Sequence, residues 1–453
     1  MPPDEVTPAD GDAAATAETP ADGGGDDGGL SFDDDPWYRR YLRESSVHLV
    51  VILLFAAYPG VYAVLTHPST PGNVEMVYLL PQVETMIVVL YFGLFAMSFD
   101  FISGYTGYLS FGHAAFFGVG AYFVVLTANG KVPLLASGTP FMISLLVAGV
   151  LAAVLALLIG SVSFRLSGVY FAMITLGVAQ VLYVLFSNWG YVGENPRDGV
   201  AVGGSHLEGF DIGIPWIDQL NLTIGAFQGD TVQGLLGFLN FSTVEVSYYM
   251  LGVIVVLSYF TMQRIVHSPF GRVMIAIREN EERARAIGYD VFRYKMGAFA
   301  ISGFFGAVAG ALFAGYSRSV SPDGSFYFLV SGDALLAAII GGFGTLGGAL
   351  FGHLFHEFLR EFLSKEGSGG GLLPYLRDVL SDSLLSTELY NGFTVGEFVE
   401  TFLNGHAALY IGIVFVLFVL YVPNGIVGTA RAYVGGTLAK QVPARFRRGG
   451  GDG

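Results

Sequence analysis

Few residues in the apolar parts of this chain could do chemistry, and most of those few are histidines and carboxylates. His353, His356 and Glu357 are spaced i, i+3 and i+4, so one face of a helix would carry all three. Such a set could in principle hold a metal ion. Two histidines without a third ligand at a defined spacing rarely suffice, however, and we therefore expect a polar stripe facing neighbouring helices and no metal site.

The chain has no phosphate-binding loop. Gly130-Lys131 lacks both the upstream glycine and the following Ser or Thr of the motif G-x-x-x-x-G-K-[ST]. The chain also has no cysteine, which excludes thiolate catalysis and cysteine-ligated metals. We therefore expect a protein that is not an enzyme and carries no cofactor. If ATP drives it, ATP and Mg²⁺ act on partner chains.

The polar segment from Ser268 to Gly288 has the clearest helix start and stop signals. Ser268 followed by Pro269 is typical of a helix start, and a glycine such as Gly288 is typical of the position just past a helix end. Two pairs at i,i+4 would each stabilise this helix by about 0.3 kcal/mol: Glu279 with Arg283, and Glu281 with Arg285. We predict one partly exposed helix, which is either a docking surface or a solvated connector.

These polar residues interrupt a chain built for lipid. It has 53% hydrophobic residues and a mean hydropathy of +0.58. Runs of roughly 20 apolar residues, the length needed to cross a bilayer, recur along it. We predict an all-α, polytopic transmembrane bundle with spans near 47–66, 78–99, 107–127, 141–163, 168–187, 246–265, 296–316 and 407–427, and a long apolar segment at 331–363.

Basic residues next to the spans predict the orientation, because Lys and Arg resist translocation. They cluster before the first span, within 264–295 and after the last span, which places both termini and a 266–294 loop in the cytoplasm. The long connections 188–245 and 364–406 are poor in basic residues and are predicted to be extracytoplasmic insertions. The chain would thus be a multi-pass protein of the cell membrane.

Parity then constrains segment 331–363. Seven single spans starting in the cytoplasm end outside, and the last span must start outside as well. Segment 331–363 must therefore return to its own side, as a re-entrant hairpin or as two spans. The glycine-rich run 341–348 permits the break. We predict eight to ten spans in all, with this one glycine-broken segment.

The net charge of −15 is concentrated in a tail. Residues 1–35 contain eleven Asp and Glu and no Lys or Arg, so we predict a disordered, acidic cytoplasmic tail over 1–36. The transmembrane domain would span 37–430, followed by a basic, Gly-rich cytoplasmic tail over 431–453. An acidic tail, four lysines against eighteen arginines and no cysteine are typical of salt-loving archaea.

Ion-coupled carriers usually keep ionisable groups inside their spans, and the predicted spans hold few. Glu84 and Asp333 lie toward the predicted outer side, and no Lys or Arg falls inside a span. His113 is the exception, as a hydrogen-bonded packing residue or as part of a gate. An ion-coupled secondary transporter or a channel is therefore the alternative class.

Several motifs resemble one family. Residues Gly104–Tyr122 (GYTGYLSFGHAAFFGVGAY) resemble the signature of LivM-type permeases, the membrane subunits of branched-chain amino-acid ABC importers. Segment 268–295 resembles the cytoplasmic coupling loop of that family. Three further stretches agree in order and spacing: 166–176, 321–323 with 339–347, and 421–428.

The resemblance implies a permease subunit that translocates branched-chain amino acids delivered by an extracytoplasmic solute-binding protein. Urea, short amides or other amino acids are alternative cargoes in related permeases. The implied partners are two ABC ATPase subunits, a second, LivH-like permease subunit or a second copy, the binding protein and the lipid bilayer, with no nucleic acid. The acidic tail and both external insertions depart from the family pattern.

Two sets of residues follow. The expected contacts to the ATPase are Arg278, Glu279, Glu281, Glu282, Arg283, Ala286 and Gly288. The expected substrate pathway comprises Gly107, Ser110, Gly112, His113, Tyr170, Thr175, Asp333, Gly341, Gly342 and Gly344. In an alternating-access cycle, broken helices at the two glycine runs would present backbone to the substrate. Alternatively, the glycines only allow close helix packing.

Overall fold

The computed structural model describes residues 37–67, 80–133, 135, 139–166, 168–202, 231–235, 239–364, 372–380, 382–390, 393–403, 407–422 and 425–429. The predicted tails 1–36 and 431–453 lie outside the described residues. The chain divides into two units, Met1–Val51 and Ile52–Gly453. The first unit contributes the opening turns of helix α1 (Trp37–Leu65), and all that follows concerns the second.

Seven described helices are long and apolar enough to cross a membrane, and two shorter apolar helices, Val51–Leu65 and Ala114–Ala128, bring the total to nine. The predicted range of eight to ten spans is confirmed, and the chain is a mostly helical, multi-pass membrane protein. The helices of the bundle are α3 (Val83–Thr106), α4 (Ala114–Ala128), α5 (Phe141–Ser163), α6 (Val169–Asn188), α7 (Thr243–Val266), α10 (Val291–Ser317), α12 (Phe328–Gly341), α13 (Leu346–Ser364) and α17 (Ala407–Tyr421).

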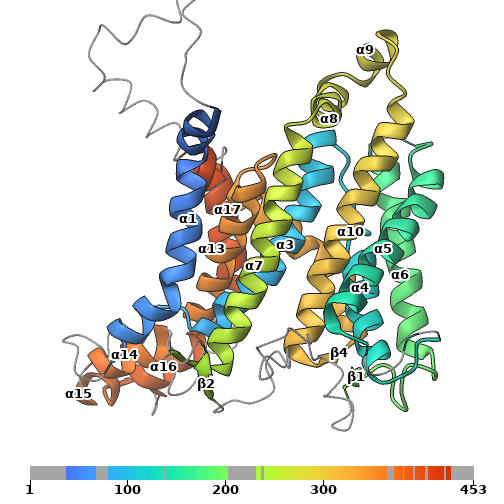
Figure 1. The fold of residues 1–453 in the computed structure, drawn as a ribbon. Helices are drawn as coiled ribbons and strands as arrows, with labels where there is room; N and C mark the ends of the chain where they lie inside the picture. The colour runs from blue at the N-terminus through green and yellow to red at the C-terminus, as the bar shows by residue number, and fades with distance from the viewer. Residues whose placement is uncertain are drawn as a thin grey trace, which may run out of the picture. The chain divides into compact units, whose positions relative to one another are not determined.

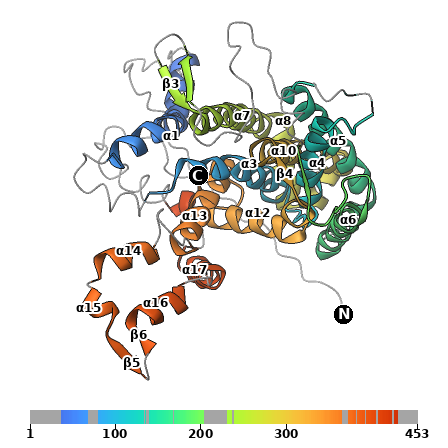
Figure 2. The same cartoon turned by 90° about the horizontal axis from the view of Figure 1, so that it is seen from below.

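Helices α3 and α10 form the centre of this bundle (Figures 1 and 2). Helix α10 packs on α3, α4 and α5, while the other side of α3 packs on α7, α12 and α13. Small residues make these contacts close: a Cβ on Gly310 would lie 1.9 Å from the carbonyl oxygen of Phe117. The outward faces of α5 and α6 carry exposed valines and leucines instead, as lipid requires.

The span expected at 107–127 is shorter than predicted. Helix α3 continues to Thr106, where Gly107 ends it with φ +80°, and α4 begins only at Ala114. A left-handed residue at a helix end favours glycine, so the sequence Gly104–Gly107 terminates one helix where we expected the start of the next. Residues 107–113 connect the two.

The glycine-broken segment is confirmed as a hairpin of two helices. Helix α12 follows the short α11 (Pro322–Ser325) and ends at Gly341, and α13 starts at Leu346. A Cβ on Gly341 would lie 1.8 Å from the carbonyl oxygen of Gly348, and one on Gly352 would lie 1.9 Å from that of Ala337, so the two helices run antiparallel in backbone contact. The 14 residues of α12 rise about 21 Å, and only together with α11, over Pro322–Gly341, is the stretch long enough to cross a membrane.

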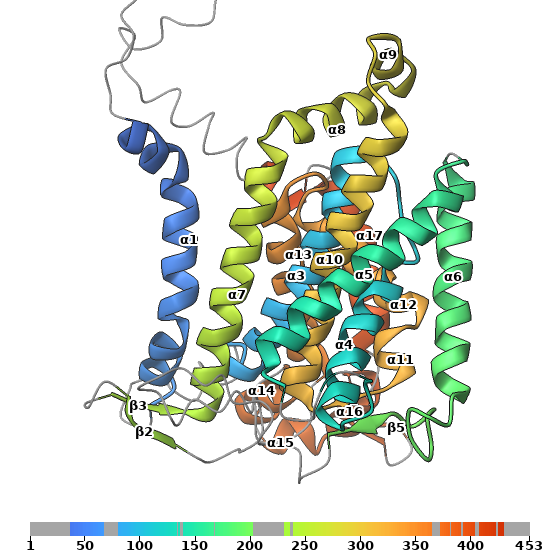
Figure 3. The same cartoon turned by 45° about the vertical axis from the view of Figure 1, so that its right-hand side comes forward.

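The predicted single helix over 268–288 is wrong, because the chain forms two helices there. Helix α8 (Pro269–Glu279) and α9 (Glu281–Ala286) are separated by Asn280, whose extended backbone (φ −160°) breaks the helix. The Asn280 side chain then caps α9 by accepting a hydrogen bond from the Arg283 N–H at 2.8 Å. Both helices lie at one end of the bundle (Figure 3).

Short strands and helices lie at the opposite end (Figure 1). Strands β1 (Val200–Ala201) and β4 (Ser319–Val320) pair antiparallel and join the connection after α6 to the end of α10. The first insertion also contains the antiparallel pair β2 (Thr231–Leu235) and β3 (Leu239–Ser242). The second contains α14 (Leu372–Val379), α15 (Asp382–Leu385), the pair β5 (Glu388–Tyr390) and β6 (Phe393–Thr394), and α16 (Val395–Leu403).

Candidate functional site: the junction of α8–α9 with the broken hairpin

Arg278, near the C-terminal end of α8, reaches the place where α3 ends. Its Nη1 donates a hydrogen bond to the carbonyl oxygen of Gly104. The last carbonyls of a helix have no partner within the helix, so a guanidinium satisfies one of them and also complements the negative end of the helix dipole. The arginine side chain remains exposed on its other side.

The break of the hairpin meets the same point. The backbone N–H of Gly344, where φ is +82°, donates to Oδ1 of Asp100 at 2.8 Å. A Cβ on Gly344 would lie 2.8 Å from Arg278 Nη1, and one on Gly104 would lie 2.3 Å from Asp100 Oδ1. Asp100 is completely buried, and its Oδ2 has no hydrogen-bond partner. These contacts join α3, α8 and the α12–α13 connection through close backbone approach.

A second contact joins α9 to the α3–α4 connection. Oε2 of Glu281 accepts hydrogen bonds from the Tyr108 hydroxyl at 2.8 Å and from the Lys295 ammonium of α10 at 2.6 Å. Burial raises the pKa of Glu281, but the hydrogen bonds from Lys295 and Tyr108 outweigh it and leave the pKa below its ordinary value. Burial and the bond to Glu281 raise the pKa of the Tyr108 hydroxyl. Glu281 is therefore an ionised carboxylate that Lys295 and Tyr108 hold in place by hydrogen bonds.

The two contacts together form the junction, which comprises Asp100, Gly104, Tyr108, Arg278, Glu281, Lys295 and Gly344. Any displacement of α8 acts directly on the end of α3 and on the hairpin break, while a displacement of α9 acts on the α3–α4 connection and α10. The junction can transmit movement; it contains no arrangement for bond chemistry.

The predicted ATPase contacts divide into inner and outer residues. Arg278 and Glu281 belong to the junction, whereas the other five are exposed: Glu279, Glu282, Arg283, Ala286 and Gly288. Of the two predicted ion pairs, Glu281–Arg285 is present at 3.0 Å. Glu279–Arg283 is not among the described ion pairs, because Asn280 interrupts the helix between them.

The exposed side of α9 is partly apolar. Ile287 is 67% exposed, and Tyr289 and Phe292 nearby are exposed as well. Such side chains beside charged ones are typical of a surface that another protein covers.

The predicted pathway residues do not form one site. Gly107 and Gly344 lie against Arg278, and Gly341 and Gly342 belong to the hairpin break. Gly112 touches the backbone of Thr175 in α6, where an added Cβ would lie 2.2 Å from the carbonyl oxygen.

The remaining pathway residues lie elsewhere. Tyr170, at the start of α6, is 67% exposed on the outer face of that helix. Ser110 is buried in the α3–α4 connection, and Asp333 lies half-buried on α12.

His113 is fully buried at the start of α4. Its Nε2 lies 3.1 Å from the Ser98 hydroxyl and 3.4 Å from that of Ser302, so the ring links α4 to α3 and α10. The N–H of the next residue, Ala114, donates to the Ser331 hydroxyl of α12 at 2.7 Å. This is the hydrogen-bonded packing role that was one of the two readings of His113.

Asp100 and Lys295 were missed, because the predicted spans ended at 99 and began at 296. The structure extends α3 and α10 past both residues, and each side chain is nearly or completely buried. The structure therefore adds Asp100 and Lys295 to the few ionisable groups of the long apolar helices. Tyr108 was missed as well, because nothing in its local sequence distinguishes it from the many other aromatic residues of the chain.

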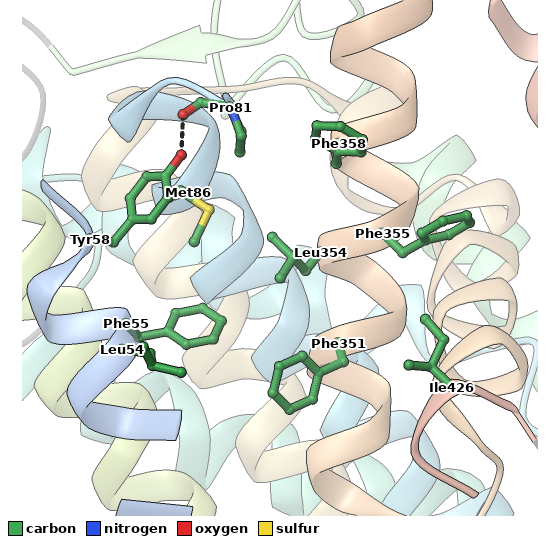
Figure 4. Close-up of a pocket in the computed structure, with 10 residues that line it drawn as sticks. All are labelled: Leu54, Phe55, Tyr58, Pro81, Met86, Phe351, Leu354, Phe355, Phe358 and Ile426. Atoms are coloured by element: carbon green, nitrogen blue, oxygen red, sulfur yellow. Dashed lines mark hydrogen bonds between the residues drawn. The ribbon is translucent and has the colours of Figure 1, made fainter. Parts of the chain in front are cut away.

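An apolar cavity lies elsewhere, between α1, α3 and α13 (Figure 4). Its volume is about 440 Å³, and almost all its lining is hydrocarbon. The hydroxyl of Tyr58, one of the lining residues, donates to the carbonyl oxygen of Pro81 at 2.5 Å (Figure 4). Among the described residues, no group of three or more His, Cys, Asp or Glu is placed to hold a metal ion.

Comparison with known proteins agrees with the motifs. Residues 83–381 match the model of the family described as branched-chain amino acid transport system / permease component. The permease protein LivM of the high-affinity branched-chain amino acid transport system of Escherichia coli is 29% identical over 69% of this chain and 72% of its own length. The probable LivM of Methanocaldococcus jannaschii is 24% identical over 61% of this chain and 80% of its own length.

The similarity extends beyond LivM proteins. The ribose import permease protein RbsC of Bacillus subtilis is 27% identical over 42% of this chain and 60% of its own length. No solved structure matches the chain. Because the family model covers most of the chain, including both helices of the hairpin and the α8–α9 segment, this protein belongs to the permease-component family of branched-chain amino acid transport systems.

Proposed function

We propose that this chain is the membrane-spanning subunit of an ABC importer, which passes branched-chain amino acids delivered by an extracytoplasmic solute-binding protein into the cell. Its partners are two ATPase subunits and a second permease subunit, LivH-like or a second copy. ATP and Mg²⁺ bind to the ATPases. The chain lies in the cell membrane, with both termini and α8–α9 in the cytoplasm.

One observation carries the coupling role: the α8–α9 segment is exposed on one side and attached to the junction on the other. Ile287 and the charged residues of α9 are available to an ATPase, while Arg278 and Glu281 contact α3, α10 and the hairpin break. A solvated connector has no need of a buried lysine, and the Lys295 side chain is only 4% exposed. Nucleotide-driven movement of the ATPase would thus reach the hairpin.

Two variants in the reconstituted transporter distinguish binding of the ATPase from transmission of its movement to the membrane helices. Ile287→Asp is expected to weaken ATPase binding about tenfold or more, because it places a charge in a buried contact. Glu281→Gln is expected to leave ATPase binding unchanged while reducing the amino acid imported per ATP hydrolysed. Normal membrane insertion of both variants is the folding control. Unchanged ATPase binding in Ile287→Asp contradicts the docking surface.

The rival classes make different predictions for uptake. A secondary carrier depends on an ion gradient and a channel depends on neither gradient nor ATP, whereas this proposal requires ATP and a binding protein. Leucine uptake into vesicles with each component omitted in turn therefore distinguishes the three. Related permeases that carry urea or short amides make the cargo a separate question, and ligand binding to the purified binding protein answers it.

A further inference from the structure

A second group of titratable side chains lies along the hairpin, away from the junction. It comprises Asp333 on α12 and His353, His356, Glu357 and Arg360 on α13, and we call it the hairpin polar cluster. With a rise of about 1.5 Å per residue, Asp333 lies about 12 Å before the end of α12 and Glu357 about 17 Å beyond the start of α13. Both distances are measured from the break between the two helices. Because the helices are antiparallel, Asp333 and the α13 residues lie at a similar distance from that break.

The cluster is largely buried, and part of its hydrogen-bonding capacity is unused. His353 is only 3% exposed, and neither of its ring nitrogens has a hydrogen-bond partner. His356 is 8% exposed, and its Nδ1 also has no hydrogen-bond partner. Buried polar atoms are almost always satisfied, so orphaned ones indicate a missing water, ion or ligand.

The charges of the cluster are of both signs. Arg360 Nη1 lies 3.6 Å from Glu357 Oε1, and Glu357 Oε2 lies 3.9 Å from His356 Nδ1. Asp333 has Arg360 and Glu357 as its electrostatic neighbours. The Arg360 side chain is 61% exposed while that of Glu357 is 12% exposed, so the cluster opens at the arginine and closes toward the histidines.

Aromatic rings form the remaining walls. The ring of Phe92 on α3 stacks on His353 with centroids 5.0 Å apart and planes 19° apart. Tyr91 on α3 has Glu357, Arg360 and Tyr316 of α10 as its electrostatic neighbours. Four spans, α3, α10, α12 and α13, therefore converge on a site with one cation, unpaired nitrogens and apolar surface. Its carboxyl groups are those of Asp333 and Glu357, with Glu361 as a further electrostatic neighbour of Glu357. Ionisable groups inside a membrane are costly, and they mark functional sites such as substrate or ion paths and proton relays.

We propose that the hairpin polar cluster binds an apolar α-amino acid in transit, with its carboxylate on Arg360, its ammonium on Glu357 and Asp333, and its hydrocarbon side chain toward Phe92. Both charges of a zwitterion find an opposite partner here, and one unprotonated nitrogen of each histidine ring can accept a remaining ammonium hydrogen. A simple cation would leave Arg360 unused, and a simple anion would meet Asp333, Glu357 and Glu361. This proposal rests on the amino-acid cargo proposed above.

Photolabelling of the complete transporter with the diazirine analogue of leucine tests the site. Proteoliposomes with ATPases and binding protein are irradiated with and without nucleotide, and the labelled peptides are identified by mass spectrometry. We expect label in α3, α12 or α13 around the cluster. Arg360→Gln should reduce both this label and leucine uptake about tenfold or more, because a charge-assisted contact is lost. Arg360→Lys should retain part of both.

Controls keep the outcomes separate. Arg165→Gln, the same change at an exposed arginine after α5, should change neither label nor uptake. Co-purification of the ATPase subunits with Arg360→Gln and with Glu357→Gln shows that each variant transporter is assembled. No label in these helices under either nucleotide condition, or uptake within about twofold of wild type in both Arg360→Gln and Glu357→Gln, overturns the site. If wild type imports no leucine, the proposed cargo fails, while the label still decides whether the cluster binds a zwitterion.

Discussion

The junction at the hairpin break and the hairpin polar cluster differ in how completely their charged and polar groups are hydrogen-bonded. In the junction, Arg278, Glu281 and Lys295 each have a partner at hydrogen-bond distance, while Oδ2 of Asp100 has none. Farther along α13, neither ring nitrogen of His353 has a hydrogen-bond partner, and the Glu357–Arg360 pair is long, at 3.6 Å. A mostly satisfied network resists deformation and transmits displacement, whereas a less satisfied one gains by accepting a ligand. The same helix pair thus has one end suited to transmitting movement and one suited to binding the transported amino acid.

The largest effect should come from breaking the contact between α12 and α13. Gly341→Ala places a Cβ 1.8 Å from the carbonyl oxygen of Gly348, a clash with backbone that cannot move aside cheaply. We expect a loss of about 3 kcal/mol or more in stability, measured as a lower melting temperature of the purified protein. Gly332→Ala on the same helix meets nothing within 4 Å and should leave the melting temperature unchanged. Equal melting temperatures of the two variants would contradict backbone contact.

A smaller loss is expected when the junction loses its carboxylate. Glu281→Gln leaves the Lys295 ammonium, whose side chain is 4% exposed, without a counter-charge. We expect a cost of about 1–3 kcal/mol in unfolding experiments. Arg293→Gln, on α10 like Lys295, removes the ion pair between Arg293 and Asp290. The Arg293 side chain is 84% exposed, so this change should cost less than about 0.5 kcal/mol. Similar losses in both variants would mean that the junction is no more than another surface pair.

Arg278→Lys should mainly affect coupling. Lysine keeps the charge but cannot direct a planar N–H at Gly104 from the same position, so the link from α8 to α3 weakens. We expect a stability change of about 1 kcal/mol or less and a lower ratio of transport to ATP hydrolysis. An unchanged ratio would assign transmission to the Glu281 contact alone.

The smallest effect concerns pH. The pKa of Glu281 is below its ordinary value, because Lys295 and Tyr108 favour the ionised form against the opposing effect of burial. Its stabilisation is therefore fully present above the ordinary glutamate range and disappears as the pH falls through the lowered pKa. The difference in melting temperature between wild type and Glu281→Gln should shrink on acidification from pH 7 toward about pH 3. A difference that grows on acidification would reverse this assignment.

The hairpin could be predicted because two sequence signals agreed: charge parity required a return, and the run of glycines at 341–348 showed where. The end of α3 was misplaced, because hydropathy cannot tell a helix-ending glycine such as Gly107 from one inside a span. That error placed Asp100 outside the membrane region, and a similar one at 296 did the same for Lys295. The break at Asn280 was missed, since ion-pair spacing favoured one continuous helix over a second capped start.

Which residues meet in space was hardest to predict. Tyr108 and Glu281 are 173 positions apart in the chain, and Asp100 and Gly344 are 244 apart. Single-sequence periodicity says nothing about such pairs, because they depend on how whole helices pack. The pathway residues chosen from motifs therefore divided between the junction, helix packing and one outward-facing tyrosine, Tyr170.

The contact between α12 and α13 has a mechanical consequence. Gly341, Gly348 and Gly352 bring the two backbones into contact near the break, so this part of the pair forms a stiff seam without an internal hinge. A residue inserted here would force the two backbones apart. The long second insertion instead begins beyond the free end of α13, after Ser364.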